Sequence, residues 1–279
     1  MQVEELKKIA SQVRRDIVRM VHGAKSGHPG GSLGCADYLV ALYFEVMQHN
    51  KNFSMDGINE DLFFLSNGHI SPLFYSVLAH SGYFEKSELA TFRRLNTRLQ
   101  GHPTTHEHLP GIRMASGSLG QGISVAIGAA MAKKLNNDNN LVYVLCGDGE
   151  MQEGQNWEAI MFAAKQKTDN IIVAIDVNGQ QIDGSTDDVM GHYPLDAKFL
   201  AFGWNVFSMN GNDMEDIIET MKKVKLETGK GQPIAIMMRT EMGAGVDYMM
   251  GSHKWHGIAP NDDDLAKALA QLPETLGDY

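Results

Sequence analysis

The sequence predicts an α/β protein in which a parallel sheet carries helices on both faces. Two short apolar runs, residues 141–146 and 171–175, have the length and composition of strands that are buried on both sides. Between these runs, apolar residues recur at helical spacing: Trp157, Ile160, Met161 and Ala164. A strand, a helix and a second strand in this order are typical of parallel strands joined by a crossover helix.

Other segments show the same two periodicities. We expect helices where apolar residues repeat at helical spacing, over residues 3–21, 123–135, 214–228 and 262–272. Another helix should begin at Ser71, because Pro72 suits its first turn. Apolar runs predict further strands over residues 61–66 and 233–237. Residues 92–110 read as an irregular segment, and residues 187–203 as a surface turn followed by a short helix.

Composition narrows the possible functions. The chain has 279 residues, of which 43% are hydrophobic, enough for one large α/β domain. A net charge of −10 argues against nucleic acid or an anionic membrane as the partner. The two cysteines, Cys35 and Cys146, do not form a disulfide framework. No signal peptide is apparent, and no apolar run approaches the roughly 20 residues that span a bilayer. We therefore expect a cytoplasmic protein.

The turns after the two central strands carry oxygen ligands. Asp148 lies between two glycines directly after the first strand, and Asn178 follows the second. Because both turns lie at carboxyl ends of parallel strands, the two side chains can converge on one cation. With the backbone carbonyl of Gln180, they would form half of an octahedral shell. Mg²⁺ accepts such a set when phosphate oxygens and water complete it, so the sequence predicts a metal-bound diphosphate here.

The two turns and their spacing resemble the thiamine diphosphate fingerprint, a GDG followed some two dozen or more residues later by an Asn. More narrowly, GDGEMQEGQNWEA, DNIIVAIDVNGQQIDG and GSTDDVM resemble the N-terminal half of transketolase. The motifs SGHPG, SNGH, GHP and GSLGQG elsewhere in the chain are similar to motifs of the same family. The resemblance covers nearly the whole chain. It implies a Rossmann-like, thiamine diphosphate-binding fold over residues 1–279.

This resemblance also implies roles for individual residues. It implies a metal site for Mg²⁺ (or Ca²⁺ or Mn²⁺) formed by Asp148, Asn178 and Gln180. It implies four catalytic histidines: His28, His69, His102 and His253. The cofactor-binding residues that it implies are His69, Gly117, Leu119, Asp148, Gly149, Glu153, Asn178, Ile182 and His253.

Some residues depart from the family pattern or have no assigned role. Thr104 stands where the family has an acidic residue, and the lysines of the family's KGKG motif are missing after Thr240. His106 and His108 have no counterpart that carries a role over, and His256 belongs to the family's WHG pattern without an assigned role. The histidine-rich residues 102–108 could suggest zinc, but structural zinc sites use tighter Cys/His pairs. Glu153 could also be a helix N-terminal charge.

The function implied is transfer of a two-carbon ketol unit from a ketose, phosphorylated or otherwise anionic, to an aldose through thiamine diphosphate. In the family the glutamate that activates the cofactor lies in the pyrimidine-binding domain. We expect that domain and the C-terminal domain on a separate chain. The expected assembly is a heterotetramer with two copies of each chain, active only when both are present.

Three alternatives remain open. Two are other thiamine diphosphate enzymes, resembling 1-deoxyxylulose-5-phosphate synthase or the E1 component of a 2-oxoacid dehydrogenase; the histidine motifs favour transketolase over E1. The third is a non-catalytic binding or regulatory protein that kept the fold. Retention of Asp148, Asn178 and the four candidate histidines argues against it.

Overall fold

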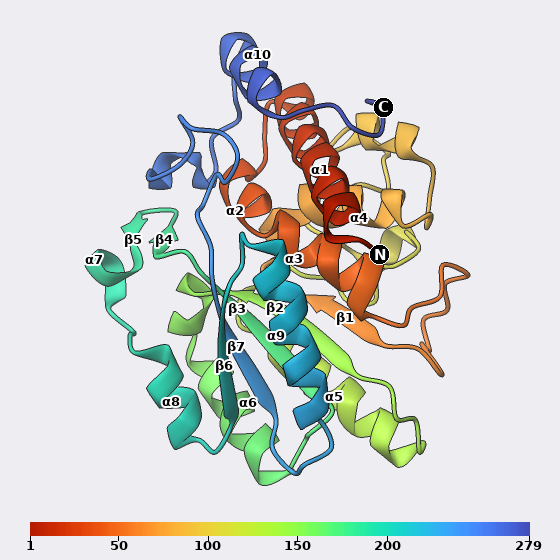
Figure 1. The fold of residues 1–279 in the computed structure, drawn as a ribbon, viewed down its shortest axis with the longest axis vertical. Helices are drawn as coiled ribbons and strands as arrows, with labels where there is room; N and C mark the ends of the chain where they lie inside the picture. Colours follow the sequence, from red (N-terminus) through yellow and green to blue (C-terminus); the bar gives the residue numbers. More distant parts are fainter.

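The computed structural model describes residues 1–279 and contains a five-stranded, entirely parallel sheet (Figure 1). The strand order is β1-β2-β3-β7-β6. The bounds are β1 Leu62–Leu65, β2 Val142–Gly147, β3 Ile171–Val177, β6 Asn205–Asn210 and β7 Ile234–Arg239. The predicted strands at residues 61–66, 141–146, 171–175 and 233–237 are confirmed. The edge strand β6 was not predicted, because Asn205, Ser208 and Asn210 interrupt its apolar pattern.

Helices cover both faces of the sheet, as the sequence predicts. On one face lie α1, α3, α4 and α9, with α10 packed against α1, and on the other face lie α5, α6 and α8. The bounds are α1 Val3–Ala24, α2 Pro29–Gly34, α3 Ala36–Ala41, α4 Ser71–His80, α5 Gly122–Leu135, α6 Gly154–Lys165, α7 Thr186–Met190, α8 Leu195–Ala201, α9 Met214–Glu227 and α10 Asp262–Gln271. None of these helices has the length and apolar character needed to cross a membrane.

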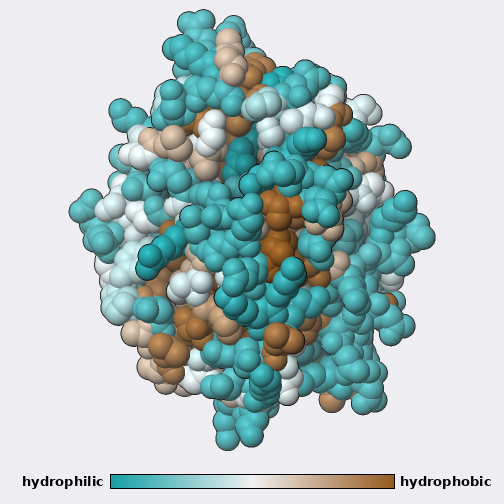
Figure 2. All heavy atoms as spheres, viewed as in Figure 1, coloured by the Kyte–Doolittle hydropathy of each residue, from teal (hydrophilic) through white to brown (hydrophobic).

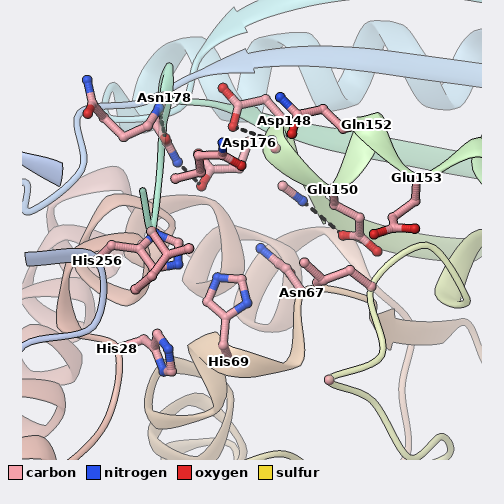
Figure 3. Close-up of a pocket in the computed structure, with 18 residues that line it drawn as sticks. His28, Asn67, His69, Asp148, Glu150, Gln152, Glu153, Asp176, Asn178 and His256 are labelled. Carbon is pink, nitrogen blue, oxygen red and sulfur yellow. Dashed lines mark hydrogen bonds between the residues drawn. The ribbon is translucent and has the colours of Figure 1, made fainter. Parts of the chain in front are cut away.

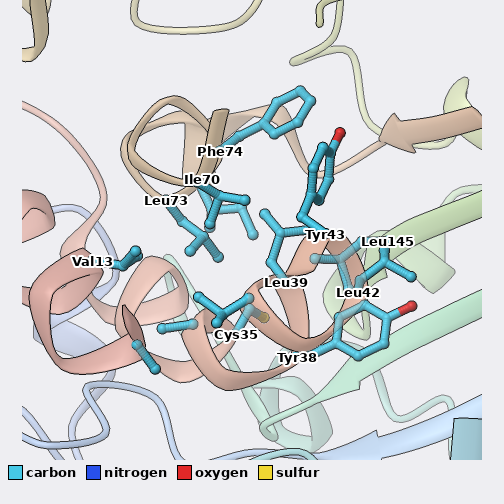
Figure 4. Packing of buried hydrophobic residues seen from close by; sticks show 14 of the residues in the cluster. Val13, Cys35, Tyr38, Leu39, Leu42, Tyr43, Ile70, Leu73, Phe74 and Leu145 are labelled. Carbon is cyan, nitrogen blue, oxygen red and sulfur yellow. The ribbon is translucent and has the colours of Figure 1, made fainter. Parts of the chain in front are cut away.

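Successive strand residues point to opposite faces and enter two separate cores. In β2, Tyr143 and Leu145 belong to the larger core, whereas Val142 and Val144 belong to the smaller one. Figure 4 shows members of the larger core that come from different elements: Val13 of α1, Tyr38 of α3, Leu73 of α4 and Leu145 of β2. Burial of both strand faces explains why the strands read as continuous apolar runs.

The molecular surface is mostly polar on the face that carries α9 (Figure 2). Small apolar areas interrupt it. The polar covering follows from the amphipathic pattern of α9, in which Met214, Ile217 and Met221 turn inward.

Side-chain caps set the starts of several helices. At α9, the Asp213 carboxylate accepts hydrogen bonds from the backbone N–H groups of Glu215 and Asp216. At α10, Asn261 and Asp264 form a capping box. The helices predicted over residues 3–21, 123–135, 214–228 and 262–272 are confirmed within three residues at each end.

Short elements complete the carboxyl edge of the sheet. The strands β4 (Gln180–Gln181) and β5 (Gly184–Ser185) form a small antiparallel hairpin after β3. Short helical segments span Leu42–Val46, Gly68–Ile70, Lys86–Thr91, Thr105–Glu107, Gly149–Gln152 and His253–His256. Because all five strands are parallel, the turns that follow β1, β2 and β3 meet at one edge.

Candidate active site

A cavity of about 340 Å³ opens at this edge (Figure 3). Its lining comes from separate loops: one before α2, one after β1, one before α5, and the turns after β2 and β3. The lining residues are His28, Gly31, Asn67, His69, Gly117, Leu119, Gly147, Asp148, Gly149, Glu150, Gln152, Glu153, Asp176, Asn178, Gln180, Gln181, Ile182 and His256. Among these lining residues, only Leu119 and Ile182 are hydrophobic.

Asp148 joins the turn after β2 to the turn after β3. Its Oδ1 accepts a hydrogen bond from the Gly149 N–H at 2.7 Å, and its Oδ2 accepts one from the Gly179 N–H at 2.7 Å. The Tyr193 hydroxyl also donates to Oδ2, at 2.7 Å. Burial raises the pKa of Asp148, and these donors oppose that rise. The carboxylate is therefore fixed in position at the floor of the cavity.

Asn178 is held by its neighbours in the turn after β3. Its Nδ2 donates to Asp176 Oδ2 at 2.7 Å, and its Oδ1 accepts from the Gln180 N–H at 2.9 Å. The Thr240 hydroxyl donates to the other oxygen of Asp176. In this conformation Asn178 Oδ1 faces its own turn rather than Asp148. Because an amide oxygen has two lone pairs, Oδ1 can bind a cation while it still accepts from the Gln180 N–H.

The donor set suits a hard divalent cation. Burial, together with the charge of Asp148, raises the pKa of Asp176 to about 6. A cation bound by Asp148, the Asn178 amide oxygen and the Gln180 carbonyl would relieve this repulsion between carboxylates. Oxygen ligands of this kind are those that Mg²⁺ takes beside phosphate. The residues present therefore fit a metal-bound diphosphate.

Three histidines face one another across the cavity. The ring centroid of His28 lies 5.1 Å from that of His69 and 5.6 Å from that of His256. The centroids of His69 and His256 are 5.0 Å apart. Burial lowers the pKa of all three, to about 4 for His28 and well below the usual value for His69. All three are neutral at pH 7, so each ring offers one N–H donor and one nitrogen acceptor.

His28 is expected to titrate near pH 4 in the folded chain, because burial disfavours its imidazolium form. In the unfolded chain the same group takes up a proton near pH 6.5. His28 therefore lowers the free energy of unfolding as the pH falls from about 6.5 to about 4, and contributes nothing above that range. A His28→Gln variant should lose less stability on acidification. An NMR titration of the ring with a midpoint near 6.5 would contradict this expectation.

The structure corrects the expectation for His253. His253 is exposed and does not line the cavity, whereas His256 does. Both belong to the single turn His253–His256, whose inner side packs against α2 and β4. His253 is the first residue of that turn and faces solvent, while His256 reaches His28 and His69. Of the two histidines in this turn, His256 is therefore the one that faces the cavity.

His102 lies beside the cavity rather than in its lining. Its ring centroid is 6.4 Å from that of His28, and its side chain is largely exposed. It packs over Gly117, where a Cβ atom would come within 2.7 Å of the His102 ring. Gly117 also has a φ of +112°, a region that other residues rarely adopt. Glycine at 117 thus allows His102 and the loop before α5 to approach each other.

The remaining predicted residues lie at the rim. Leu119, Gly149, Glu153 and Ile182 line the cavity, where Glu153 is exposed and Ile182 is 57% exposed. In the segment 102–108, His106 and His108 are exposed outside the cavity. No group of three His, Cys, Asp or Glu side chains is arranged to hold a metal ion.

Sequence reasoning missed Glu150, which is 2% exposed and connects three loops. Its Oε1 accepts hydrogen bonds from the Ser66 hydroxyl and, at 2.7 Å, from the Gly120 N–H. Its Oε2 accepts from the Gly147 N–H at 3.2 Å. The signal available in the sequence was the position of Glu150, a charged residue directly after a buried strand and its GDG turn. The contact between Tyr193 and Asp148 spans 45 residues and had no sequence signal.

Comparison with known proteins identifies the family. The profile described as "Transketolase, thiamine diphosphate binding domain" matches residues 6–274. An apulose-4-phosphate transketolase subunit of Phocaeicola vulgatus is 37% identical over 276 residues, which cover 99% of this chain and 96% of that protein. The 6-deoxy-6-sulfo-D-fructose transketolase subunit SqwG of a Clostridium species is 36% identical over 271 residues, covering 96% of each chain.

Solved structures agree with this result. The transketolase of Campylobacter jejuni superposes with a TM-score of 0.89 and 35% sequence identity over 98% of this chain. The match covers 43% of the Campylobacter chain, so the present chain spans less than half of that transketolase. The chain therefore belongs to the transketolase family, and it corresponds to the thiamine diphosphate-binding, N-terminal part of a transketolase-type transferase.

Proposed function

We propose that this chain is the N-terminal subunit of a two-chain transketolase that transfers a two-carbon ketol unit from a ketose to an aldose. The observation that carries the proposal is the cavity at the carboxyl edge, where Asp148, Asn178 and Gln180 meet three neutral histidines. The near full-length similarity to chains that are themselves named as transketolase subunits supports the same assignment.

The chain's own residues would hold the cofactor by its diphosphate end. Asp148, Asn178 Oδ1 and the Gln180 carbonyl would bind the divalent metal, and Gly149 allows close approach of the backbone. Around the remaining space lie His69, Gly117, Leu119, Glu153 and Ile182. When bound, thiamine diphosphate supplies the nucleophilic carbon that the transfer reaction needs.

The histidines would act on the sugar. The Nδ1 atom of His28 is buried and has no hydrogen-bond partner, and its ring faces those of His69 and His256. Neutral imidazoles can donate to or accept from sugar hydroxyls and can hold a proton at a ring nitrogen. We infer that His28, His69 and His256 orient the ketose, with His102 at the entrance.

The proposed partner is a second chain with the pyrimidine-binding domain and its activating glutamate. Relatives that are named as subunits imply such a partner. Glu153 is exposed at the cavity rim, where it could contact that chain. We propose an assembly of two copies of each chain. The donor is proposed to be a ketose with a phosphate or another anionic group, because the relatives are named for apulose 4-phosphate or 6-deoxy-6-sulfo-D-fructose.

Reconstitution tests this proposal. Ketol transfer should appear when the chain is mixed with its partner, thiamine diphosphate and Mg²⁺, and should be absent for each chain alone. Ketose donors with phosphate, sulfonate or neutral ends, and pyruvate as an alternative donor, would define the substrate class. Robust transfer by this chain alone would refute the two-chain proposal, and activity with pyruvate but not with any ketose would refute the transketolase reaction.

The pair His256 and His253 provides a matched test of the site. His256→Ala should lower kcat/KM by about 100-fold or more, as expected for loss of a side chain that acts in proton transfer. His253→Ala, three positions earlier in the same turn, should stay within about threefold of wild type, because surface substitutions rarely disturb a fold. Steady-state kinetics of the reconstituted enzyme measure both. Equal losses in the two variants would contradict the placement of His256 in the cavity.

A further inference from the structure

We propose that the side-chain amide of Asn67 is an additional ligand of the diphosphate, donating a hydrogen bond from Nδ2 to a phosphate oxygen. The inference rests on the proposed cofactor site and adds a residue to it. Asn67 follows β1 and precedes His69.

The sheet places Asn67 beside the diphosphate-binding turn. Strands β1 and β2 are paired in parallel, with Leu65 opposite Leu145. Asn67 follows the end of β1, and Gly147, which immediately precedes Asp148, ends β2 beside it. Both Asn67 and Gly147 line the cavity. A ligand bound at Asp148 is thus within reach of the Asn67 side chain.

The Asn67 amide is buried and has no partner in the protein. The residue is 1% exposed, its Oδ1 is buried without a hydrogen bond, and its Nδ2 donates to no protein acceptor. Figure 3 shows the amide nitrogen directed into the cavity, between His69 and Asp176. Of the two amide atoms, only the free Nδ2 can donate to a phosphate oxygen, whereas the unpaired Oδ1 accepts and needs a donor.

Neighbouring groups are already committed to other contacts. The Ser66 hydroxyl donates to Glu150, and Gly68 packs against Ser116 and Gly117 so closely that an added Cβ would meet the Ser116 hydroxyl oxygen at 2.3 Å. These contacts hold the backbone on both sides of Asn67. Its side chain is therefore fixed in place while its amide remains available.

Charge favours a phosphate oxygen as the acceptor. The floor of the cavity carries the carboxyl groups of Asp148, Glu150 and Asp176, which repel an anion. A bound diphosphate therefore needs the metal and uncharged donors on its other side. The Asn67 amide is such a donor. A sugar hydroxyl is the other conceivable acceptor, and separate measurements of cofactor Kd and ketose KM distinguish the two.

Asn67→Leu tests the proposal because it should weaken cofactor binding without lowering the stability of the protein. Leucine has a similar size and no polar atom, so the free energy of unfolding without ligand should stay unchanged or rise. The Kd for Mg²⁺–thiamine diphosphate, and for Mg²⁺–pyrophosphate, should increase by about tenfold, as for loss of one hydrogen bond to a charged group. Calorimetry on the full chain, alone and with its partner, measures Kd, and urea unfolding measures stability. Asn67→Ala serves as a second variant, with the same expected loss of affinity.

Asn170→Leu is the matched control. Asn170 is also buried, but its Nδ2 donates to the Ala130 carbonyl at 2.9 Å, at the amino end of β3 and remote from the cavity. This variant should lose stability and keep its affinity for both ligands.

The outcomes separate failure of the inference from failure of the proposed function. If the wild-type enzyme takes up no Mg²⁺–thiamine diphosphate, the proposed function fails. If the wild type binds but both Asn67 variants bind equally well, only the inference is overturned. An unchanged Kd together with a raised KM for the ketose would also overturn it, because Asn67 would then contact the sugar.

Discussion

Asp148→Asn is expected to abolish metal-dependent uptake of thiamine diphosphate, raising Kd by at least about 100-fold. The substitution keeps the size of the side chain but removes the charge that binds the divalent cation. It also replaces one of the two carboxylate oxygens that accept from Gly149, Gly179 and Tyr193. Calorimetric titration of the reconstituted enzyme with thiamine diphosphate, at several Mg²⁺ concentrations, measures the loss.

Glu158→Gln is the control for this experiment. Glu158 lies on α6, ten positions from Asp148, and its side chain is exposed. The substitution removes one negative charge at an exposed position, where charges are screened by salt. The Kd for thiamine diphosphate should therefore stay within about twofold of the wild-type value. If Asp148→Asn bound the cofactor as tightly as wild type and with the same Mg²⁺ dependence, the metal site would have to be placed elsewhere.

Glu150→Ala is expected to lower the free energy of unfolding by about 3 kcal/mol and to weaken cofactor binding as well. The variant leaves the Ser66 hydroxyl and the N–H groups of Gly120 and Gly147 without an acceptor, at a cost of about 1–3 kcal/mol each, less where water enters. The loops that these donors belong to carry Asn67, Gly117 and Asp148. Loosening them disorders the cavity, so urea unfolding and calorimetry should both report the change.

The contribution of Glu150 is its acceptor capacity rather than its charge. Burial raises its pKa, which means that the ionised form is penalised where it lies. Glu150→Gln keeps one oxygen acceptor and should fall between wild type and Glu150→Ala. Glu153→Ala removes an exposed carboxylate three positions away and should change stability by less than about 0.5 kcal/mol. Equal stability of the Glu150→Ala and Glu153→Ala variants would show that the three loops hold together without Glu150.

The sequence by itself determined the central strands, the helices between them and the location of the functional turns. Strands β2 and β3 are continuous apolar runs because both of their faces are buried, and such runs are local signals. Asp148 and Asn178 follow these strands directly. Their convergence at one edge of the sheet follows from parallel pairing, which the crossover helix already implied. The family resemblance rested on the same motifs, and the comparisons confirmed it.

The tertiary structure alone decided which side chains meet. The edge strand β6 was missed because an edge position tolerates polar residues such as Asn205 and Ser208, which weaken the apolar pattern. His256 rather than His253 entered the cavity because packing of their shared turn against α2 and β4 selects one side of it. The bonds from Tyr193 to Asp148 and from Ser66 to Glu150 join residues far apart in the chain. Periodicity and local motifs report only neighbours along the chain, whereas these contacts exist only after folding brings distant loops together.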